Sequence, residues 1–541
     1  MGIYRIPTPK NEPVKSYAPG SPEREALKKA IADLKTRKLE VPMVIGGKDV
    51  TTDDIVKMTM PHEHGFELGH YYRGGKTEIE MAVTAALDVR NDWVNLPWEQ
   101  RAAIFLKAAD LLSGPYRALM NAATMLAHSK NAFQAEIDAV CELADFFRFN
   151  VWYMQQIYDM QPDSAPTTWN YLDYRPLEGF VFAVTPFNFV SIAGNLPTAP
   201  AIMGNVAIWK PASSVVYTAH LIMKILKEAG LPDGVINLIT ARGSDVGDLI
   251  MKNPHLAGIH FTGSTGTFQS MWKTVGENIA QYKGYPRIVG ETGGKDFVFV
   301  HNSATPIEVV TALVRGAFEY QGQKCSAASR AYIPASMWED VRELLVKQIG
   351  ELKMGSPEDF RNFINAVIDR SAFNDIASFI DYAKQSKDCK IIIGGNYDDS
   401  KGYFIEPTVV VTPDPHFKLM EEEIFGPVLT IFVYQDADFE KTLYLCDQTS
   451  PYALTGAIFA RDRKAVALAS RILRHAAGNF YINDKPTGAV VGQQPFGGAR
   501  SSGTNDKAGS LLNMIRWTSP RTIKETLVPP TDYRYPFMGD K

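Results

Sequence analysis

The chain has 541 residues, of which 45% are hydrophobic and 21% charged, so its composition is that of a globular protein with about two to four domains. The net charge of −4 leaves no basic excess for phosphates, which argues against nucleic acid as a partner. The four cysteines form no C-x-x-C pair and the ten histidines no H-E-x-x-H motif, so we expect neither a disulfide framework nor a metal. No run of about 18 apolar residues predicts a membrane span.

The first residues contain neither an apolar leader nor an Arg/Ser-rich presequence. We therefore expect a cytoplasmic protein, or a mitochondrial matrix protein if the chain is a processed eukaryotic one. Ser21-Pro22-Glu23 has the features of a helix start: a cap residue, proline in the first turn and an acid near the positive end of the helix dipole. We expect a docking helix within residues 1–40.

Residues 78–160 have a strongly helical pattern, for example from Asn131 to Tyr158. Within this stretch, Glu142 and Asp145 interrupt an apolar face. On pattern alone, the acids of such an amphipathic helix would face water.

Residues 166–177 are polar and aromatic with strand-like alternation, which predicts a β-flap. From Gly179 onward strands alternate with helices, which predicts a parallel sheet whose ligand crevice lies at the carboxyl ends of its strands. We expect strands at 179–184, 205–210, 235–240 and 258–261, and helices at 191–203 and 215–229. Thr185, Lys210 and Gly263 all fall at strand ends.

A run of small residues leads from the 258–261 strand into a helix: Gly263, Ser264, Thr265, Gly266 and Thr267. Such residues let backbone N–H groups approach an anion at a helix N-terminus, although a plain turn has the same composition. The run is not G-x-G-x-x-G, and the chain has no P-loop.

Two further stretches contain residues suited to catalysis. Glu291 lies among glycines, and we expect it at the start of a strand at 297–300. A helix at 306–320 and a strand at 329–334 flank a polar, glycine-bearing loop that contains Cys325. A thiol nucleophile needs a base, and a covalent intermediate needs an activated water, so one glutamate could serve both steps.

The E-x-G-G-K stretch at 291–295 and the G-Q-x-C stretch at 322–325 resemble those of the aldehyde dehydrogenase superfamily, and the resemblance extends from about Ile45 to Thr526. The stretches 145–150, 185–189 and 491–500 are more narrowly similar to the Δ1-pyrroline-5-carboxylate dehydrogenase family. The resemblance implies an α/β aldehyde dehydrogenase fold, with a Rossmann-like parallel-sheet cofactor domain, an α/β catalytic domain and a β-flap for oligomerisation. The expected boundaries are 41–165 and 179–290 for NAD binding, 291–486 for catalysis, and 166–178 with 510–541 for oligomerisation.

The resemblance also assigns roles to individual residues. The implied catalytic residues are Cys325 as nucleophile, Glu291 as base and Asn188 as oxyanion donor. The implied NAD-binding residues are Thr185, Lys210, Gly263, Ser264, Thr265, Gly266, Thr267, Glu423 and Phe425. The implied substrate-binding residues are Glu142, Phe189, Ser326, Gly488, Ala489 and Phe496. Without the resemblance, Glu423 would be assigned to a solvated acidic turn, and the glycines near Ala489 to relief of crowding.

The activity implied is oxidation of L-glutamate γ-semialdehyde to L-glutamate with NAD⁺, as the second step of proline degradation. Some NADP use stays open, because Ser213 stands where many NAD-preferring relatives carry a glutamate. Alternatives are an enzyme for another aldehyde, or an inactive binding protein on the same scaffold. The expected partners are a small-molecule substrate and further copies of the chain, as a homodimer or a higher homo-oligomer, with no nucleic acid and no membrane.

Overall fold

Two seven-stranded sheets organise the computed structural model, which describes residues 4–539. The first has the strand order β11-β10-β7-β8-β9-β2-β3. Its strands run parallel from β11 to β9, whereas β2 pairs antiparallel with β9 and with β3. The predicted alternation of strands and helices is confirmed, because parallel neighbours need crossover connections. These strands are β2 (Met43–Ile45), β3 (Lys48–Val50), β7 (Phe180–Val184), β8 (Val206–Lys210), β9 (Ile236–Leu238), β10 (Leu256–Thr262) and β11 (Arg287–Glu291).

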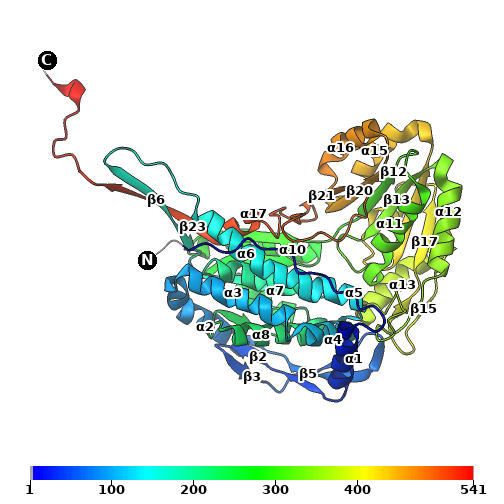
Figure 1. Ribbon diagram of the computed structural model, residues 1–541, viewed down its shortest axis with the longest axis horizontal. Coiled ribbons are helices and arrows are strands. Elements are labelled where there is room, and N and C mark those ends of the chain that lie inside the picture. Colours follow the sequence, from blue (N-terminus) through cyan, green and yellow to red (C-terminus); the bar gives the residue numbers. More distant parts are fainter. Residues whose placement is uncertain (1–3, 540–541) are drawn as a thin grey trace.

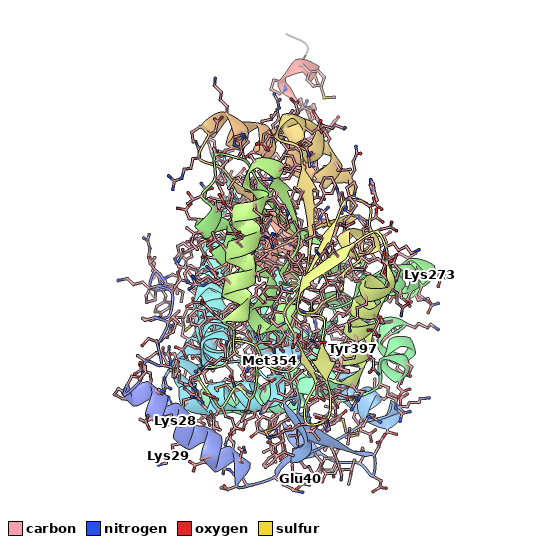
Figure 2. The ribbon with its side chains drawn as sticks, turned by 90° about the vertical axis from the view of Figure 1, so that its right-hand side faces the viewer. Lys28, Lys29, Glu40, Lys273, Met354 and Tyr397 are labelled. Atoms are coloured by element: carbon pink, nitrogen blue, oxygen red, sulfur yellow. The ribbon has the colours of Figure 1, made fainter. Side chains whose placement is uncertain are left out.

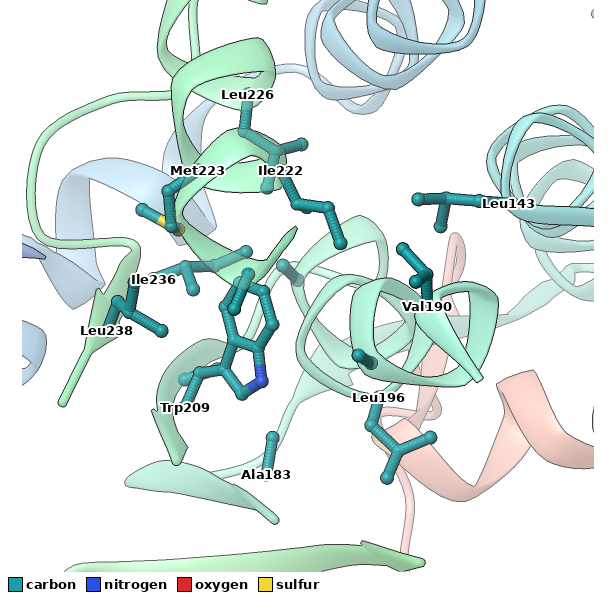
Figure 3. Close-up of a cluster of buried hydrophobic side chains, with 14 of the residues drawn as sticks. Leu143, Ala183, Val190, Leu196, Trp209, Ile222, Met223, Leu226, Ile236 and Leu238 are labelled. Atoms are coloured by element: carbon teal, nitrogen blue, oxygen red, sulfur yellow. The ribbon is translucent and has the colours of Figure 1, made fainter. Parts of the chain in front are cut away.

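Apolar side chains bind the first sheet to its helices. Trp209 of β8 is fully buried and lies between Ile222 and Met223 of one helix and Leu196 of another (Figure 3). The indole N–H of Trp209 donates to the Thr185 hydroxyl at 3.0 Å, so this large core residue leaves no unsatisfied donor. The two helices are α8 (Val216–Ala229) and α7 (Val190–Ile202), with α3 (Trp98–Ser113), α4 (Arg117–His128) and α6 (Leu143–Tyr158) packed around them.

The second sheet has the order β14-β17-β18-β13-β12-β20-β21, and only β14 is antiparallel to its neighbour. β12 shows why both faces are covered: Phe297 and Phe299 join one buried cluster, Val298 and Val300 another. The strands are β12 (Asp296–Val300), β13 (Ala328–Pro334), β14 (Lys390–Ile393), β17 (Thr408–Thr412), β18 (Val428–Tyr434), β20 (Thr455–Phe459) and β21 (Asn479–Ile482). The covering helices are α11 (Pro306–Phe318), α12 (Ala335–Gly350), α13 (Arg370–Gln385), α15 (Phe439–Gln448) and α16 (Arg463–Ile472).

The predicted flap is a two-stranded ribbon. β6 (Thr168–Pro176) pairs antiparallel with β23 (Thr518–Thr526) along its whole length. The ribbon projects from the body of the molecule, and the chain after β23 extends further outward (Figure 1). Exposed apolar side chains lie on both segments, among them Trp169, Val528 and Phe537. A two-stranded ribbon is marginally stable by itself, and these apolar side chains are exposed to solvent.

The expected N-terminal helix is α1 (Pro22–Lys35). Its buried residues Leu27, Ile31 and Leu34 face the body, whereas Lys28 and Lys29 lie at the outer edge of the molecule (Figure 2). A second small sheet, with the order β1-β5-β4, lies at the same end of the chain and comprises β1 (Leu39–Val41), β4 (Ile55–Met60) and β5 (Glu63–Tyr72). Within residues 4–539, no helix combines the length and apolarity needed to cross a membrane.

The helical stretch from Asn131 to Tyr158 differs from the pattern-based expectation. It is interrupted by a π-helix, η1 (Glu136–Glu142), before α6 begins. Asp145 is only 3% exposed, and Glu142 is half-buried, so the expectation that these acids face water is wrong. The reason is an extended N-terminal arm, residues 4–20, that covers this helix: the Asn11 side-chain amide and the Glu12 backbone N–H both donate to the Asp145 carboxylate, at 2.8 and 2.7 Å.

Candidate active site

The loop that contains Cys325 begins with three left-handed residues. Tyr320, Gln321 and Gly322 have φ values of 52°, 54° and 67°, so α11 ends at Phe318 and not, as predicted, at Tyr320. A Cβ on Gly322 would clash with the carbonyl oxygen of Gly426, which explains why glycine occupies that position. The Gln321 amide N–H donates to two backbone carbonyls, at 3.2 and 2.8 Å, and these bonds offset the cost of the strained turn.

Cys325 lies at the wall of a cavity of about 720 Å³ and is itself 7% exposed. Burial raises the pKa of its thiol well above the usual value, and the carboxylates of Asp296, Glu423 and Glu291 raise it further. The sulfur of Cys325 is therefore a thiol, and its activation requires transfer of the proton to a base.

Glu291 reaches the same cavity from the other sheet. It is the last residue of β11, and so the expectation that it starts the 297–300 strand is wrong. The backbone N–H of Gly498 donates to its carboxylate at 2.7 Å, and burial raises the pKa of this carboxyl well above its usual value. Lys507 opposes that shift. A carboxyl group with a raised pKa is suited to general base chemistry near neutral pH.

Asn188 follows β7 and is 3% exposed. Among the described residues its side-chain amide has no hydrogen-bond partner, so its donors are free for another group. Asn188 lies beside the cavity wall rather than in it, whereas its neighbour Phe189 is part of the wall.

All six residues assigned to substrate binding line the cavity that contains Cys325 and Glu291. Ser326 is not free, because its hydroxyl donates to the Thr487 hydroxyl at 2.9 Å. Glu142 is bonded through one carboxylate oxygen, which lies 2.9 Å from the Ser191 hydroxyl. The remaining residues of this set in the wall are Phe189, Gly488, Ala489 and Phe496.

The residues assigned to the cofactor lie outside this cavity, most of them at the carboxyl ends of β7, β8 and β10. Ser264 caps α10 (Thr265–Glu277) by accepting the Thr267 N–H at 3.3 Å. Among the described residues, the N–H groups of Thr265 and Gly266 have no acceptor, and a Cβ on Gly266 would meet no atom within 4 Å. An anion can therefore approach this helix N-terminus closely.

Lys210 ends β8, and burial lowers the pKa of its amine, with no opposing carboxylate among the described residues. Thr185 is fixed beside it, since the Thr185 N–H donates to the Lys210 carbonyl at 3.1 Å. A buried amine without an acidic partner fits the hydroxyl groups of a ribose.

Glu423 accepts the Gly294 N–H at 3.0 Å, and burial raises the pKa of its carboxyl to about 7. Phe425 has a φ of 55°, and its ring packs edge-on against Phe187 at 5.7 Å. These residues lie next to the Cys325 loop, as a nicotinamide site must. The groups at the N-terminus of α10 and at Lys210 thus fit one end of a dinucleotide, and those at Glu423 and Phe425 fit the other.

Pattern reasoning missed two residues that build the site. Lys485 donates from Nζ to the Thr487 carbonyl at 2.8 Å and so holds the loop before Gly488, whose φ is 97°. Lys324 pairs with Glu319 at 3.1 Å beside the nucleophile. Their signal in the sequence was position alone, directly before the glycine loop and directly before Cys325.

Comparisons with known proteins identify the family of this chain. A family model described as the aldehyde dehydrogenase family matches residues 49–523. The chain is 53% identical to the mitochondrial delta-1-pyrroline-5-carboxylate dehydrogenase of Dictyostelium discoideum, over 99% of this chain and 96% of that one. It is 49% identical to the human mitochondrial protein of the same name, over 98% and 94%. The crystal structure of the Mycobacterium tuberculosis delta-pyrroline-5-carboxylate dehydrogenase bound with NAD superposes with a TM-score of 0.96, at 53% identity and 99% coverage of both chains. The chain belongs to the aldehyde dehydrogenase family.

Proposed function

We propose that the protein oxidises L-glutamate γ-semialdehyde, the open-chain form of 1-pyrroline-5-carboxylate, to L-glutamate with NAD⁺, as the second step of proline degradation. The observation that carries this proposal is the composition of one cavity. Its wall combines a thiol and a carboxyl group for acyl chemistry, Cys325 and Glu291, with a second acid, Glu142, and a glycine loop at Gly488. An aldehyde with an ammonium and a carboxylate is complementary to that set.

In the proposed mechanism, Cys325 attacks the aldehyde carbon after its proton passes to Glu291. The side-chain amide of Asn188 and the backbone N–H of Cys325 hold the resulting oxyanion. Bound NAD⁺ supplies the hydride acceptor. The aldehyde carbon then remains as a thioester on Cys325. Glu291 releases to solvent the proton that it took from Cys325, and it then takes a proton from the water that hydrolyses the thioester. L-Glutamate and the free thiol are the products.

The substrate is proposed to bind by its two charged ends. Glu142 receives the α-ammonium group, and the backbone N–H groups of Gly488 and Ala489 receive the α-carboxylate. Phe189 and Phe496 flank the aliphatic part. The contribution of Ser326 is limited to its hydroxyl oxygen as long as it donates to Thr487.

The cofactor is proposed to lie along the strand ends of residues 41–165 and 179–290, with 291–486 as the catalytic domain. The pyrophosphate binds at the N-terminus of α10, in the run from Gly263 to Thr267. Lys210 and Thr185 hold the adenosine side, and Glu423 and Phe425 hold the nicotinamide side. NAD is the proposed coenzyme, and Ser213 leaves room for some NADP use, because it adds no charge that would repel a 2′-phosphate.

The flap and the C-terminal segment, 166–178 and 510–541, are proposed to join copies of the chain into a homodimer or higher homo-oligomer. The exposed Trp169 and Phe537 support this role. The proposed compartment is the cytoplasm, or the mitochondrial matrix for a processed eukaryotic chain. The names of the Dictyostelium and human relatives support the second.

The test is NADH formation with 1-pyrroline-5-carboxylate, beside propanal and other simple aldehydes. The proposal expects turnover of 1-pyrroline-5-carboxylate that is lost in Cys325→Ala. Turnover is expected to be retained in Cys389→Ala, because Cys389 is not among the residues that line the cavity. Activity on simple aldehydes alone would keep the chemistry and discard the substrate. NAD binding without turnover of any aldehyde would instead indicate an inactive binding protein.

A further inference from the structure

One serine hydroxyl lies between two carboxyl groups beside the cavity. The Ser191 Oγ is 2.7 Å from an oxygen of Asp138 and 2.9 Å from an oxygen of Glu142. A hydroxyl group has a single proton and can donate to only one of them. If both acids were ionised, an oxygen lone pair of Ser191 would face a carboxylate at hydrogen-bond distance. One of the two acids must therefore carry a proton of its own.

Asp138 has the donors of an ionised carboxylate. The Lys130 ammonium donates to it at 2.6 Å, and the backbone N–H groups of Val190 and Ser191 donate at 3.0 and 2.9 Å. Asp138 thus satisfies the first turn of α7 and pairs with the fully buried Lys130, whose pKa is lowered by burial and raised by the Asp138 carboxylate. The Ser191 hydroxyl proton completes this set. The remaining contact, between Ser191 and Glu142, is then a hydrogen bond only if Glu142 is the donor.

The surroundings of Glu142 favour its neutral form. Burial raises the pKa of Glu142 to about 8, with smaller contributions from Asp138 and Asp145 in the same direction. Lys130 opposes this shift, but its ammonium is bonded to Asp138 and lies over the rings of Phe189 and Tyr320, at 4.6 and 4.4 Å.

The other elements packed against η1 add little charge of the right sign. α7 contains no ionisable side chain. In α4, burial lowers the pKa of His128 to about 3, so this imidazole is neutral. The Arg117 guanidinium of the same helix is bonded to Glu136 and Glu12. On the loop that contains Cys325, Lys324 is paired with Glu319.

We propose that Glu142 is a neutral carboxylic acid in the empty site and releases its proton when an α-ammonium group binds. This inference rests on the proposed function and defines how the amino group is recognised. On binding, Ser191 turns its proton from Asp138 to Glu142, while Asp138 keeps its three N–H donors. The ammonium then faces an ionised Glu142, and one proton leaves to solvent, so charge is conserved. Ser191 and Lys130 act as positioning residues.

The direct test counts protons. L-Glutamate is titrated into the full-length enzyme near pH 7 by calorimetry, in two buffers with different ionisation enthalpies. Glutarate, which has the same carbon chain and two carboxylates but no amino group, is the control ligand. We expect close to one proton released per site with L-glutamate and none with glutarate. Binding of L-glutamate without proton release, or equal release with both ligands, would overturn the inference.

A competition assay covers the case of weak binding. Below pH 8, the inhibition constant of L-glutamate against the aldehyde substrate is expected to fall about tenfold for each unit of rising pH, whereas that of glutarate stays flat. Parallel profiles would refute the proposal. Glu142→Gln has the shape of the neutral acid, so this variant is expected to fold, and to bind L-glutamate more weakly and without proton release. Oxidation of 1-pyrroline-5-carboxylate by the unmodified enzyme tests the proposed function separately.

Discussion

Replacing Ala489 by serine is expected to lower the KM for 1-pyrroline-5-carboxylate about tenfold. Ala489 is half-buried in the cavity wall, next to Gly488, whose left-handed conformation exposes the loop N–H groups. The loop is already held by the bond from Lys485 to the Thr487 carbonyl, so little ordering cost is added. A hydrogen bond to a charged group contributes about 1.5–3 kcal/mol, and each 1.4 kcal/mol is about tenfold in affinity. Because position 489 is half-buried, water competes for the new hydroxyl group, and this competition favours the lower end of that range.

Initial rates of NADH formation with the two enzymes measure this effect. The value of kcat is expected to stay unchanged, because the new hydroxyl is remote from the reacting carbon and stabilises ground and transition states equally. Propanal, which has no carboxylate, is the control substrate and is expected to keep its KM. An unchanged KM for 1-pyrroline-5-carboxylate, or an equal decrease for propanal, would refute the placement of the α-carboxylate at this loop.

Three further results are expected. Glu291→Gln cannot accept a proton from water, so stopped-flow absorbance is expected to show at most one NADH per site, followed by turnover slowed about 10²- to 10⁴-fold; steady turnover at the original rate would exclude Glu291 as the base. Gly293→Ala places a Cβ against the Glu423 carboxylate, so the KM for NAD is expected to rise, and an unchanged KM would contradict the role of Glu423. Burial lowers the pKa of His128 to about 3 and that of His260 to about 4. The unfolded imidazoles take up protons below about pH 6.5 while the folded ones do not, so stability is expected to fall by about 1.4 kcal/mol per pH unit for each of them as the pH decreases. Urea midpoints between pH 7 and pH 5.5 measure this slope, and His260→Gln is expected to reduce it; a flat profile would mean that neither imidazole is buried neutral.

The sequence predicted individual elements well where the signals are local. β7 and α8 lie within a residue of their expected bounds, and Gly230 ends α8 with a φ of 104°. Apolar periodicity and glycine act over a few residues, so they can be recognised without knowledge of the fold. The family resemblance predicted the fold and the residues of the candidate site. It could be recognised because the motifs that carry it are short stretches of sequence.

The tertiary structure decided which residues meet. Glu291 ends a strand of the first sheet and Cys325 follows a helix of the second, and the packing of the two sheets brings both to one cavity. The N-terminal arm buries Asp145, which the helical pattern had assigned to solvent. The place of Ser191 between Asp138 and Glu142 is also a long-range property, since it joins two helices. Periodicity reports which face of an element is apolar, whereas burial of a polar group depends on what another part of the chain supplies to satisfy it.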